Sequence, residues 1–191
     1  RMNGRAIFLT HGEVEIDPDV PVPDWGLNEV GRRRHEGFAR SDLVGKVTSV
    51  FSSIEQKARD AAAPVAARLG LDVQCVPDLG ENDRSATGYL PADEFWGVVE
   101  RFFAEPDTSV RGWETARAAQ DRIVRTVRNC LSHAPEGTPL FVAHGGVATL
   151  LRCRLLETEI TKSQGQPHPG GGCWFAFDRA MDKAPTEWSA I

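Results

Sequence analysis

Two short apolar runs, far apart in the chain, each end in a His-Gly pair, and this repeated pattern constrains the fold more than any other feature. The first run is Ala-Ile-Phe-Leu-Thr-His-Gly-Glu at residues 6–13, and the second is Leu-Phe-Val-Ala-His-Gly-Gly at residues 140–146. Apolar runs of this length that stop at glycine predict buried strands. Because α/β sheets bind ligands at the carboxyl ends of their strands, both histidines are predicted to lie at such a site.

The segments around these runs alternate between strand and helix patterns. Strands are expected near residues 5–10, 47–51, 71–76, 140–144 and 173–177, and helices near 28–41, 53–69, 93–104, 113–133 and 147–156. Ser53 and Gln56 have the spacing of a capping box, and Gly70 is expected to end that helix. The proline- and acid-rich residues 17–24 predict a non-helical loop, and the helices at 93–104 and 113–133 are expected over the sheet's edge. The alternation predicts an α/β fold in three layers, a mostly parallel central sheet covered by helices on both faces.

Composition narrows the class of protein. The chain has 191 residues, of which 41% are hydrophobic, enough for one sizeable core, so a single domain over residues 1–191 is expected. The net charge of -5 argues against a nucleic-acid partner, since binding to phosphate backbones needs a dense cationic face. No apolar stretch approaches the length of a membrane span or of a signal peptide, and the four cysteines show no secreted disulfide pattern. We therefore expect a cytoplasmic protein with no membrane partner.

The order of several short motifs resembles one known family. The motifs are Thr10-His11-Gly12-Glu13, where that family has Arg-His-Gly-Glu; Leu27 and Gly31; Ser52-Ser53 with Lys57-Ala58; Glu81; Gly112 with Glu114 and Arg122; and His144-Gly145-Gly146. In order and spacing they resemble the histidine phosphatase superfamily, which includes phosphoglycerate mutases and acid phosphatases. The resemblance spans most of the chain and implies a phosphoglycerate mutase-like fold.

The resemblance implies a phosphomonoester hydrolase that works through a phosphohistidine intermediate. His11 would attack phosphorus through a neutral ring nitrogen, while a backbone carbonyl holds its other nitrogen. His144 would donate hydrogen bonds to the phosphoryl oxygens. Glu81 would protonate the leaving oxygen and later deprotonate the attacking water.

Four further positions are implied to bind the phosphate, namely Thr10, Gly12, Lys57 and Gly145. Gly12 would leave room for the phosphate, and the backbone N–H groups that follow Gly145 would contact it at a helix N-terminus. The ligand would be inorganic phosphate or a small phosphorylated molecule. The resemblance implies neither a cofactor nor a metal ion, and it leaves the substrate and the oligomeric state open.

The chain departs from the family pattern at the phosphate-binding positions. Thr10 replaces the arginine that precedes the nucleophile, Lys57 replaces a second arginine, and Val14 stands where a polar side chain is common. Lysine is a point charge, whereas arginine is a bidentate fork. Because one preorganised donor is worth about 10²–10³ in rate, a slow enzyme is expected. The alternative is a catalytically impaired relative that binds a phosphorylated ligand or a partner protein, and Arg59 and Arg84 are candidates to compensate.

Simpler interpretations stand beside these roles. A single strand-end histidine is more often structural than catalytic, Glu81 could be a solvated loop carboxylate, and Lys57 could be a surface lysine. His35 and His133 are expected on exposed helix faces.

Two segments stay ambiguous. His168 is a candidate loop residue over the pocket, and a metal site built from His11, His144, Glu81 and His168 is a further alternative without supporting ligand spacing. Residues 82–112 are expected to form a helical insertion or lid, in which Phe95, Trp96 and Phe102 belong either to the lid surface or to the core.

Overall fold

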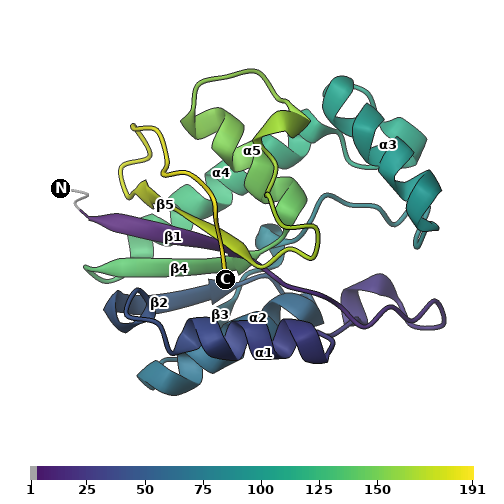
Figure 1. The fold of residues 1–191 in the computed structure, drawn as a ribbon. Helices are drawn as coiled ribbons and strands as arrows, with labels where there is room; N and C mark the ends of the chain where they lie inside the picture. Colours follow the sequence, from purple (N-terminus) through teal and green to yellow (C-terminus); the bar gives the residue numbers. More distant parts are fainter. Residues whose placement is uncertain (1–3) are drawn as a thin grey trace.

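The computed structural model describes residues 4–191 and contains a six-stranded sheet in the order β3-β2-β4-β1-β5-β6 (Figure 1). The strands are β1 (Arg5–Thr10), β2 (Val47–Ser52), β3 (Val73–Cys75), β4 (Thr138–Ala143), β5 (Cys173–Asp178) and β6 (Ser189–Ala190). β1 to β4 run parallel, whereas β5 is antiparallel to β1, and β6 to β5. The predicted mostly parallel sheet is confirmed, and the short β6 was not predicted.

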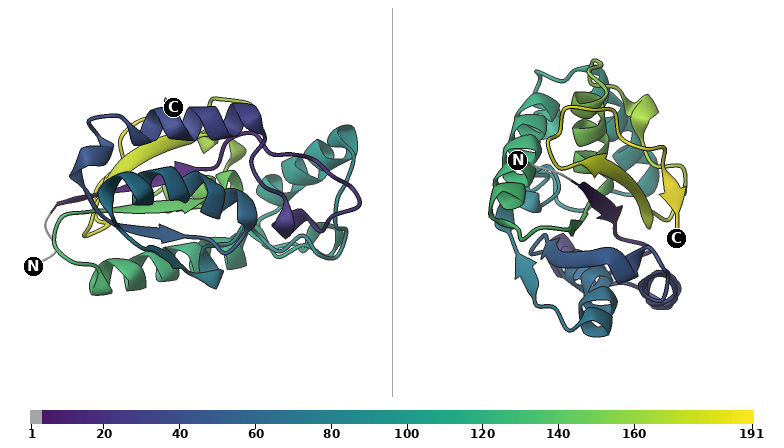
Figure 2. Two further views of the ribbon diagram at one scale, coloured as in Figure 1. Left: turned by 90° about the horizontal axis from the view of Figure 1, so that it is seen from below. Right: turned by 90° about the vertical axis from the view of Figure 1, so that its left-hand side faces the viewer.

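Helices cover both faces of the sheet, as the two side views in Figure 2 show. α1 (Glu29–Ala39) and α2 (Gln56–Leu69) cover one face, α4 (Ala116–His133) and α5 (Gly145–Leu155) cover the other, and α3 (Ala92–Ala104) covers neither. Neighbouring strand residues point to opposite faces, so Phe8 packs in the cluster that includes α4 and α5, while Ile7 packs in the cluster that includes α1 and α2. Burial on both faces explains why β1 and β4 are continuously apolar.

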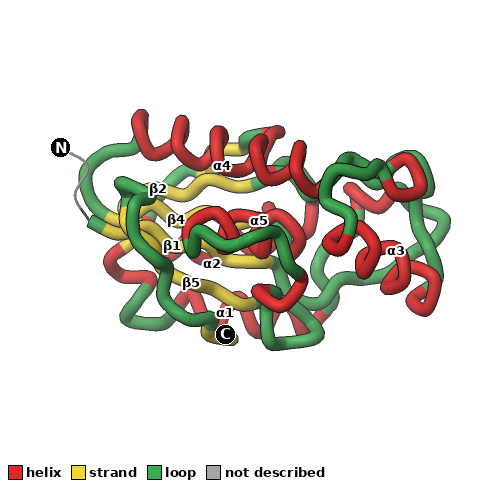
Figure 3. Tube along the Cα trace, turned by 90° about the horizontal axis from the view of Figure 1, so that it is seen from above, coloured by secondary structure: helices red, strands yellow, loops and turns green. Residues whose placement is uncertain are grey.

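α3 stands off the end of the sheet (Figure 3). Its buried residues, Val98, Val99, Phe102 and Phe103, form a separate apolar cluster with Trp113 and Leu150. α4 instead covers one face of the sheet, because Ile123 and Val127 pack in the same cluster as Phe8. The expectation that both helices lie over the sheet's edge was therefore wrong.

The helix ends follow the sequence signals in part. Gly70 ends α2 in the left-handed conformation, with a φ of 64°, as predicted. The predicted capping box is wrong: α2 begins at Gln56, and its N-cap residue, Glu55, makes no capping side-chain bond. Val22–Asp24 form a short 3-10 turn inside the segment expected to be non-helical. Among residues 4–191, none of the helices is both long and apolar enough to span a lipid bilayer.

Candidate active site

The strand register brings the two strand-end histidines together. β1 and β4 are adjacent, and Thr10 pairs with Ala143, so His11 and His144 follow at equivalent points on parallel strands. The His11 amide donates to the carbonyl of Ala143 at 3.2 Å. The two imidazole rings lie 5.2 Å apart between centroids, at an angle of 71°.

His11 is held as a neutral imidazole. Its Nδ1 lies 2.9 Å from the carbonyl oxygen of Gly12, so Nδ1 carries the proton and Nε2 keeps a free lone pair. Burial, and then the nearby charge of His144, lower the pKa of His11 to about 3. The imidazole is therefore an available nucleophile across the physiological pH range.

His35 supports the peptide that follows His11. The amide of Gly12 donates to His35 Nε2 at 2.8 Å, and the His35 side chain is fully buried. The prediction that His35 lies on an exposed helix face was wrong, because α1 packs this face against the His11 loop; His133 is exposed as predicted. A Cβ on Gly12 would lie 3.3 Å from both Gly31 Cα and His35 Nε2, so α1 fills the space that was expected to admit phosphate.

Gly31 makes this packing possible. A Cβ at this position would collide with the backbone of Glu13, since α1 starts directly against the loop after His11. The glycine of the Leu27-Gly31 motif thus has a steric reason for being there.

The buried His35 should make the protein less stable in mild acid. Burial, and then the charge of Arg34, lower the pKa of His35 from 6.5 to about 4. Between these values the unfolded chain takes up a proton that the folded chain does not, so the free energy of unfolding should fall as pH drops through this window. The shift corresponds to about 3 kcal/mol, and urea unfolding at a series of pH values measures it.

Two variants test the source of this pH dependence. His35→Ala should have a lower free energy of unfolding at neutral pH. Its free energy of unfolding should nevertheless fall less between pH 6.5 and 4 than that of the parent protein. Some of the fall should remain, because the lowered pKa of His11 contributes a pH dependence of the same sign. His133→Ala, which changes an exposed histidine, should keep the full decline. An unchanged decline in His35→Ala would contradict the assignment.

His144 contacts a hydroxyl and a carboxylate that were not predicted as active-site groups. Its Nε2 lies 2.8 Å from Ser53 Oγ and 3.0 Å from Glu55 Oε2. Ser53 Oγ also accepts the amide of Glu55 at 3.1 Å, which orders the turn before α2. The Ser52-Ser53 motif pointed to Ser53 in the sequence. Because Ser53 was interpreted as a helix N-cap, its contact with His144 was not predicted.

Glu55 and Lys57 form an ion pair beside the histidines. Lys57 Nζ lies 3.5 Å from Glu55 Oε1 and donates to the carbonyl of Val22 at 2.9 Å. The lysine is 5% exposed, so the surface alternative for Lys57 was wrong. Burial raises the pKa of Glu55, but the hydrogen bond and charge of His144 outweigh it and hold that pKa well below its usual range. Burial also lowers the pKa of Lys57, against the opposing pull of Glu55.

Glu81 occupies the N-terminus of α5. Its Oε2 accepts the amide of Gly146 at 2.8 Å, and its Oε1 accepts the amide of Val147 at 2.9 Å. A carboxylate is favourable here because it satisfies free N–H groups at the positive end of the helix dipole. The N–H groups expected to bind phosphate therefore already have an anionic partner in this structure, and the solvated-loop interpretation of Glu81 does not fit.

Two arginines surround Glu81. Arg122 donates to the carbonyl of Gly80 at 2.9 Å and to both carboxylate oxygens of Glu114, so it fixes the loop that carries Glu81. Arg84 Nη2 lies 3.8 Å from Glu81 Oε2. Its guanidinium carbon is 5.0 Å from the ring centroids of Phe95 and Trp113. Of the two compensating candidates, Arg84 lies at the site, whereas Arg59 is exposed and bonds Gln56.

Thr10 faces a loop rather than open space. It is fully buried, its Oγ1 accepts the amide of Cys173 at 3.0 Å, and it donates to Gln166 Oε1 at 2.6 Å. Gln166 also lies against Gly145, because a Cβ there would collide with Gln166 Nε2. Nothing in the sequence signalled Gln166 as a site residue.

His168 makes a local turn contact, since its Nδ1 accepts the amide of Gly170 at 2.9 Å. Within the described part of the chain, no group of three or more His, Cys, Asp or Glu side chains is placed to hold a metal ion. The four-residue metal site considered from the sequence is therefore not assembled.

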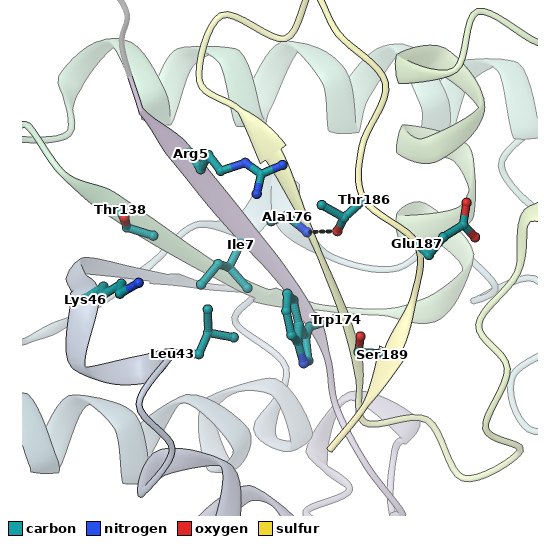
Figure 4. A pocket seen from close by; sticks show the side chains of 10 residues that line it. All are labelled: Arg5, Ile7, Leu43, Lys46, Thr138, Trp174, Ala176, Thr186, Glu187 and Ser189. Atoms are coloured by element: carbon teal, nitrogen blue, oxygen red, sulfur yellow. Dashed lines mark hydrogen bonds between the residues drawn. The ribbon is translucent and has the colours of Figure 1, made fainter.

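Two cavities found among the described residues lie away from the candidate active site. One, of about 410 Å³, is bordered by Ile7, Leu43 and Trp174 on the sheet face beside β6 (Figure 4). The other, of about 510 Å³, lies between α4, the end of α5 and residues 181–184. Neither is lined by His11, His144 or Glu81, so the chemistry of converging side chains identifies the site rather than the size of a cavity.

Comparisons with known proteins identify the family and the fold. The family model of the histidine phosphatase superfamily (branch 1) matches residues 6–182. A mycobacterial glucosyl-3-phosphoglycerate phosphatase solved with VO3 has a TM-score of 0.78 and 23% identity, over 98% of this chain and 99% of that one. The same phosphatase with inorganic phosphate has a TM-score of 0.74 and 19% identity, over 98% of this chain and 95% of that one. Bacillus stearothermophilus YhfR has a TM-score of 0.76 and 18% identity, over 90% of this chain and 89% of that one. No curated protein matches the chain significantly.

Proposed function

Because the chain belongs to the histidine phosphatase superfamily, we propose that it hydrolyses phosphomonoesters through a phosphohistidine formed on His11. One observation carries the proposal: His11 is neutral, with its Nδ1 proton on the Gly12 carbonyl and its Nε2 lone pair free. The ring that carries this free nitrogen lies 5.2 Å, between centroids, from the imidazole of His144. The fold is shared with a phosphatase solved with VO3 and with inorganic phosphate, which supports a phosphoryl ligand for this pocket.

The proposed reaction has two displacements. His11 Nε2 attacks phosphorus, the phosphorus–oxygen ester bond breaks, and the leaving alcohol takes a proton. Water then attacks the phosphohistidine, the N–P bond breaks, and inorganic phosphate leaves.

Glu81 is the proposed proton carrier for both steps. Oε1 accepts the amides of both Val147 and Asn82, whereas Oε2 accepts one backbone amide, that of Gly146, and keeps another lone pair, so Oε2 can still give and take a proton. Arg122, through its hold on the Glu81 loop, keeps the carboxylate at this place.

Trapping the intermediate tests the proposal. Brief incubation with a labelled phosphomonoester, an alkaline quench that preserves the acid-labile N–P bond, and peptide mapping should place the label on His11. p-Nitrophenyl phosphate, sugar phosphates, nucleotides and phosphopeptides form the substrate panel. Label on another residue, or turnover with no label in a rapid quench, would refute a phosphohistidine at His11.

A second function is favoured by the two contacts of Glu55. Glu55 bonds His144 and pairs with Lys57, so a carboxylate already engages two groups that a phosphoryl ligand would use. A catalytically impaired relative that binds a phosphorylated ligand or a partner protein would tolerate this arrangement. Orthophosphate binding without turnover on the substrate panel would favour it.

Residues 82–112 are the proposed lid of this single domain. They carry α3 beyond the carboxyl ends of the strands, on the side where His11 and His144 lie (Figure 1). Phe102 is 2% exposed and belongs to the core of this segment, while Trp96 is 55% exposed and is free to contact a ligand or solvent.

A further inference from the structure

We propose that the side-chain amide of Gln166, oriented by Thr10, is a phosphoryl-binding group of this pocket. The inference rests on the proposed function, since it places a phosphoryl group between His11 and His144. It assigns a role to a loop residue that lies 156 positions from its partner Thr10.

The Thr10 hydroxyl sets the orientation of the amide. Its oxygen accepts the amide of Cys173 at 3.0 Å, which leaves its single proton for an acceptor. Two acceptors are in reach, Gln166 Oε1 at 2.6 Å and the Cys173 carbonyl at 3.2 Å, and the shorter contact is to Gln166. With Oε1 bound to Thr10, the NH₂ group of Gln166 must point the other way.

The NH₂ group lies at the ends of the two histidine-bearing strands. It sits against Gly145, which directly follows His144, because a Cβ on Gly145 would collide with Gln166 Nε2. A Cβ on Gly171 would lie 3.7 Å from the same nitrogen and would collide with the carbonyl of His11. Gln166 Nε2 is thus next to the backbone of both histidine motifs.

The two N–H groups of the Gln166 side-chain amide are available to a ligand. Among residues 4–191, Gln166 Nε2 makes no hydrogen bond, although Thr10 fixes the other end of the amide. Several other donors at the site are engaged: Glu81 accepts the amides of Gly146 and Val147, and Glu55 contacts His144 and Lys57. A planar NH₂ group offers two N–H donors to phosphoryl oxygens without adding charge.

The test measures ligand binding separately from turnover. Gln166→Met keeps the length of the side chain but removes its donors, and Gln164→Met is the matched control on the same loop. Calorimetry with orthophosphate and vanadate should show affinity lowered by about 10–100-fold in Gln166→Met, the usual worth of a hydrogen bond to a charged group. Gln164→Met should bind like the parent protein.

Thr10→Val tests the orienting role. It keeps the shape of Thr10 and removes the hydroxyl, so the affinity for phosphate should fall by less than in Gln166→Met. The double variant should bind no more weakly than Gln166→Met alone, since Thr10 acts through the amide. Circular dichroism checks folding, and Gln166→Asn, which withdraws the amide by one methylene, replaces Gln166→Met if that variant unfolds.

Unchanged phosphate affinity in a folded Gln166→Met, or an equal loss in Gln164→Met, would overturn the inference even if the protein is an active hydrolase. A parent protein that binds neither orthophosphate nor vanadate would also overturn it. If the parent binds phosphate through Gln166 but hydrolyses no ester, the inference stands and the proposed hydrolase fails.

Discussion

Replacing His11 by alanine should lower kcat/KM for p-nitrophenyl phosphate by at least about 10³–10⁴-fold, because removal of a nucleophile leaves only binding and electrostatic stabilisation. Steady-state kinetics measure the loss. His133→Ala changes an exposed histidine on α4 and serves as the control, with kinetics equal to those of the parent. His11 is partly accessible and lies at a strand end, so the loss should not come from unfolding, which thermal denaturation checks.

Added imidazole separates the nucleophile from a structural role. In His11→Gly the vacated space should admit free imidazole, which can attack phosphorus in place of the side chain and restore part of the rate. A variant that keeps more than a tenth of the parent kcat/KM without imidazole would show that His11 is not the nucleophile.

The framework of the site could be predicted because it depends on local patterns. The apolar runs that end at His11 and His144 are long enough to identify strands, and a parallel register between neighbouring strands brings their ends together. Gly70 ends α2 in the left-handed conformation, which favours glycine, as the sequence predicted. These features need little knowledge of distant partners.

The inner contacts of the site could not be predicted because their partners lie far apart in the chain. Gln166 meets Thr10 only after α5 and the following loop fold back, and His35 is buried only because α1 packs against Gly12. Ser53 matched a local capping pattern, but its contact with His144, 91 residues away, decided its role. Tertiary packing overrode the local signal for His35 and Ser53, and Gln166 carried no local signal.

The balance of charge at the candidate active site separates the two proposed functions. Lys57 and Arg84 are its cations, but each stands next to a carboxylate, Glu55 or Glu81. A phosphoryl dianion entering this space meets two acidic groups as well as two basic ones, which predicts weaker electrostatic attraction than an arginine-lined site would give. Glu55 is the group to test, since Glu81 already has partners in the backbone of α5.

Glu55→Gln should tighten orthophosphate binding by about 10–100-fold. A phosphate placed about 4 Å from the Glu55 carboxylate would be repelled by about 4 kcal/mol at an effective dielectric constant of 20, and relaxation of the pocket removes part of this. The amide keeps the shape of the side chain and a contact to His144 Nε2, while Lys57 Nζ, now 3.5 Å from a neutral oxygen, becomes free to bind the anion. Calorimetry measures the phosphate affinity of Glu55→Gln. Glu15→Gln, which removes the same charge from an exposed loop residue, is the control and should bind phosphate like the parent protein.

The turnover of Glu55→Gln then distinguishes the two functions. A rise in kcat together with tighter phosphate binding identifies an enzyme that is slowed by its own carboxylate. Tighter phosphate binding with no turnover on the substrate panel identifies a binding protein in which the donors needed for the transition state are missing. Weaker phosphate binding in Glu55→Gln would contradict the electrostatic argument, because it would mean that the ionised carboxylate helps the ligand by holding His144 and Lys57 in place, and that this gain exceeds its repulsion of the phosphate.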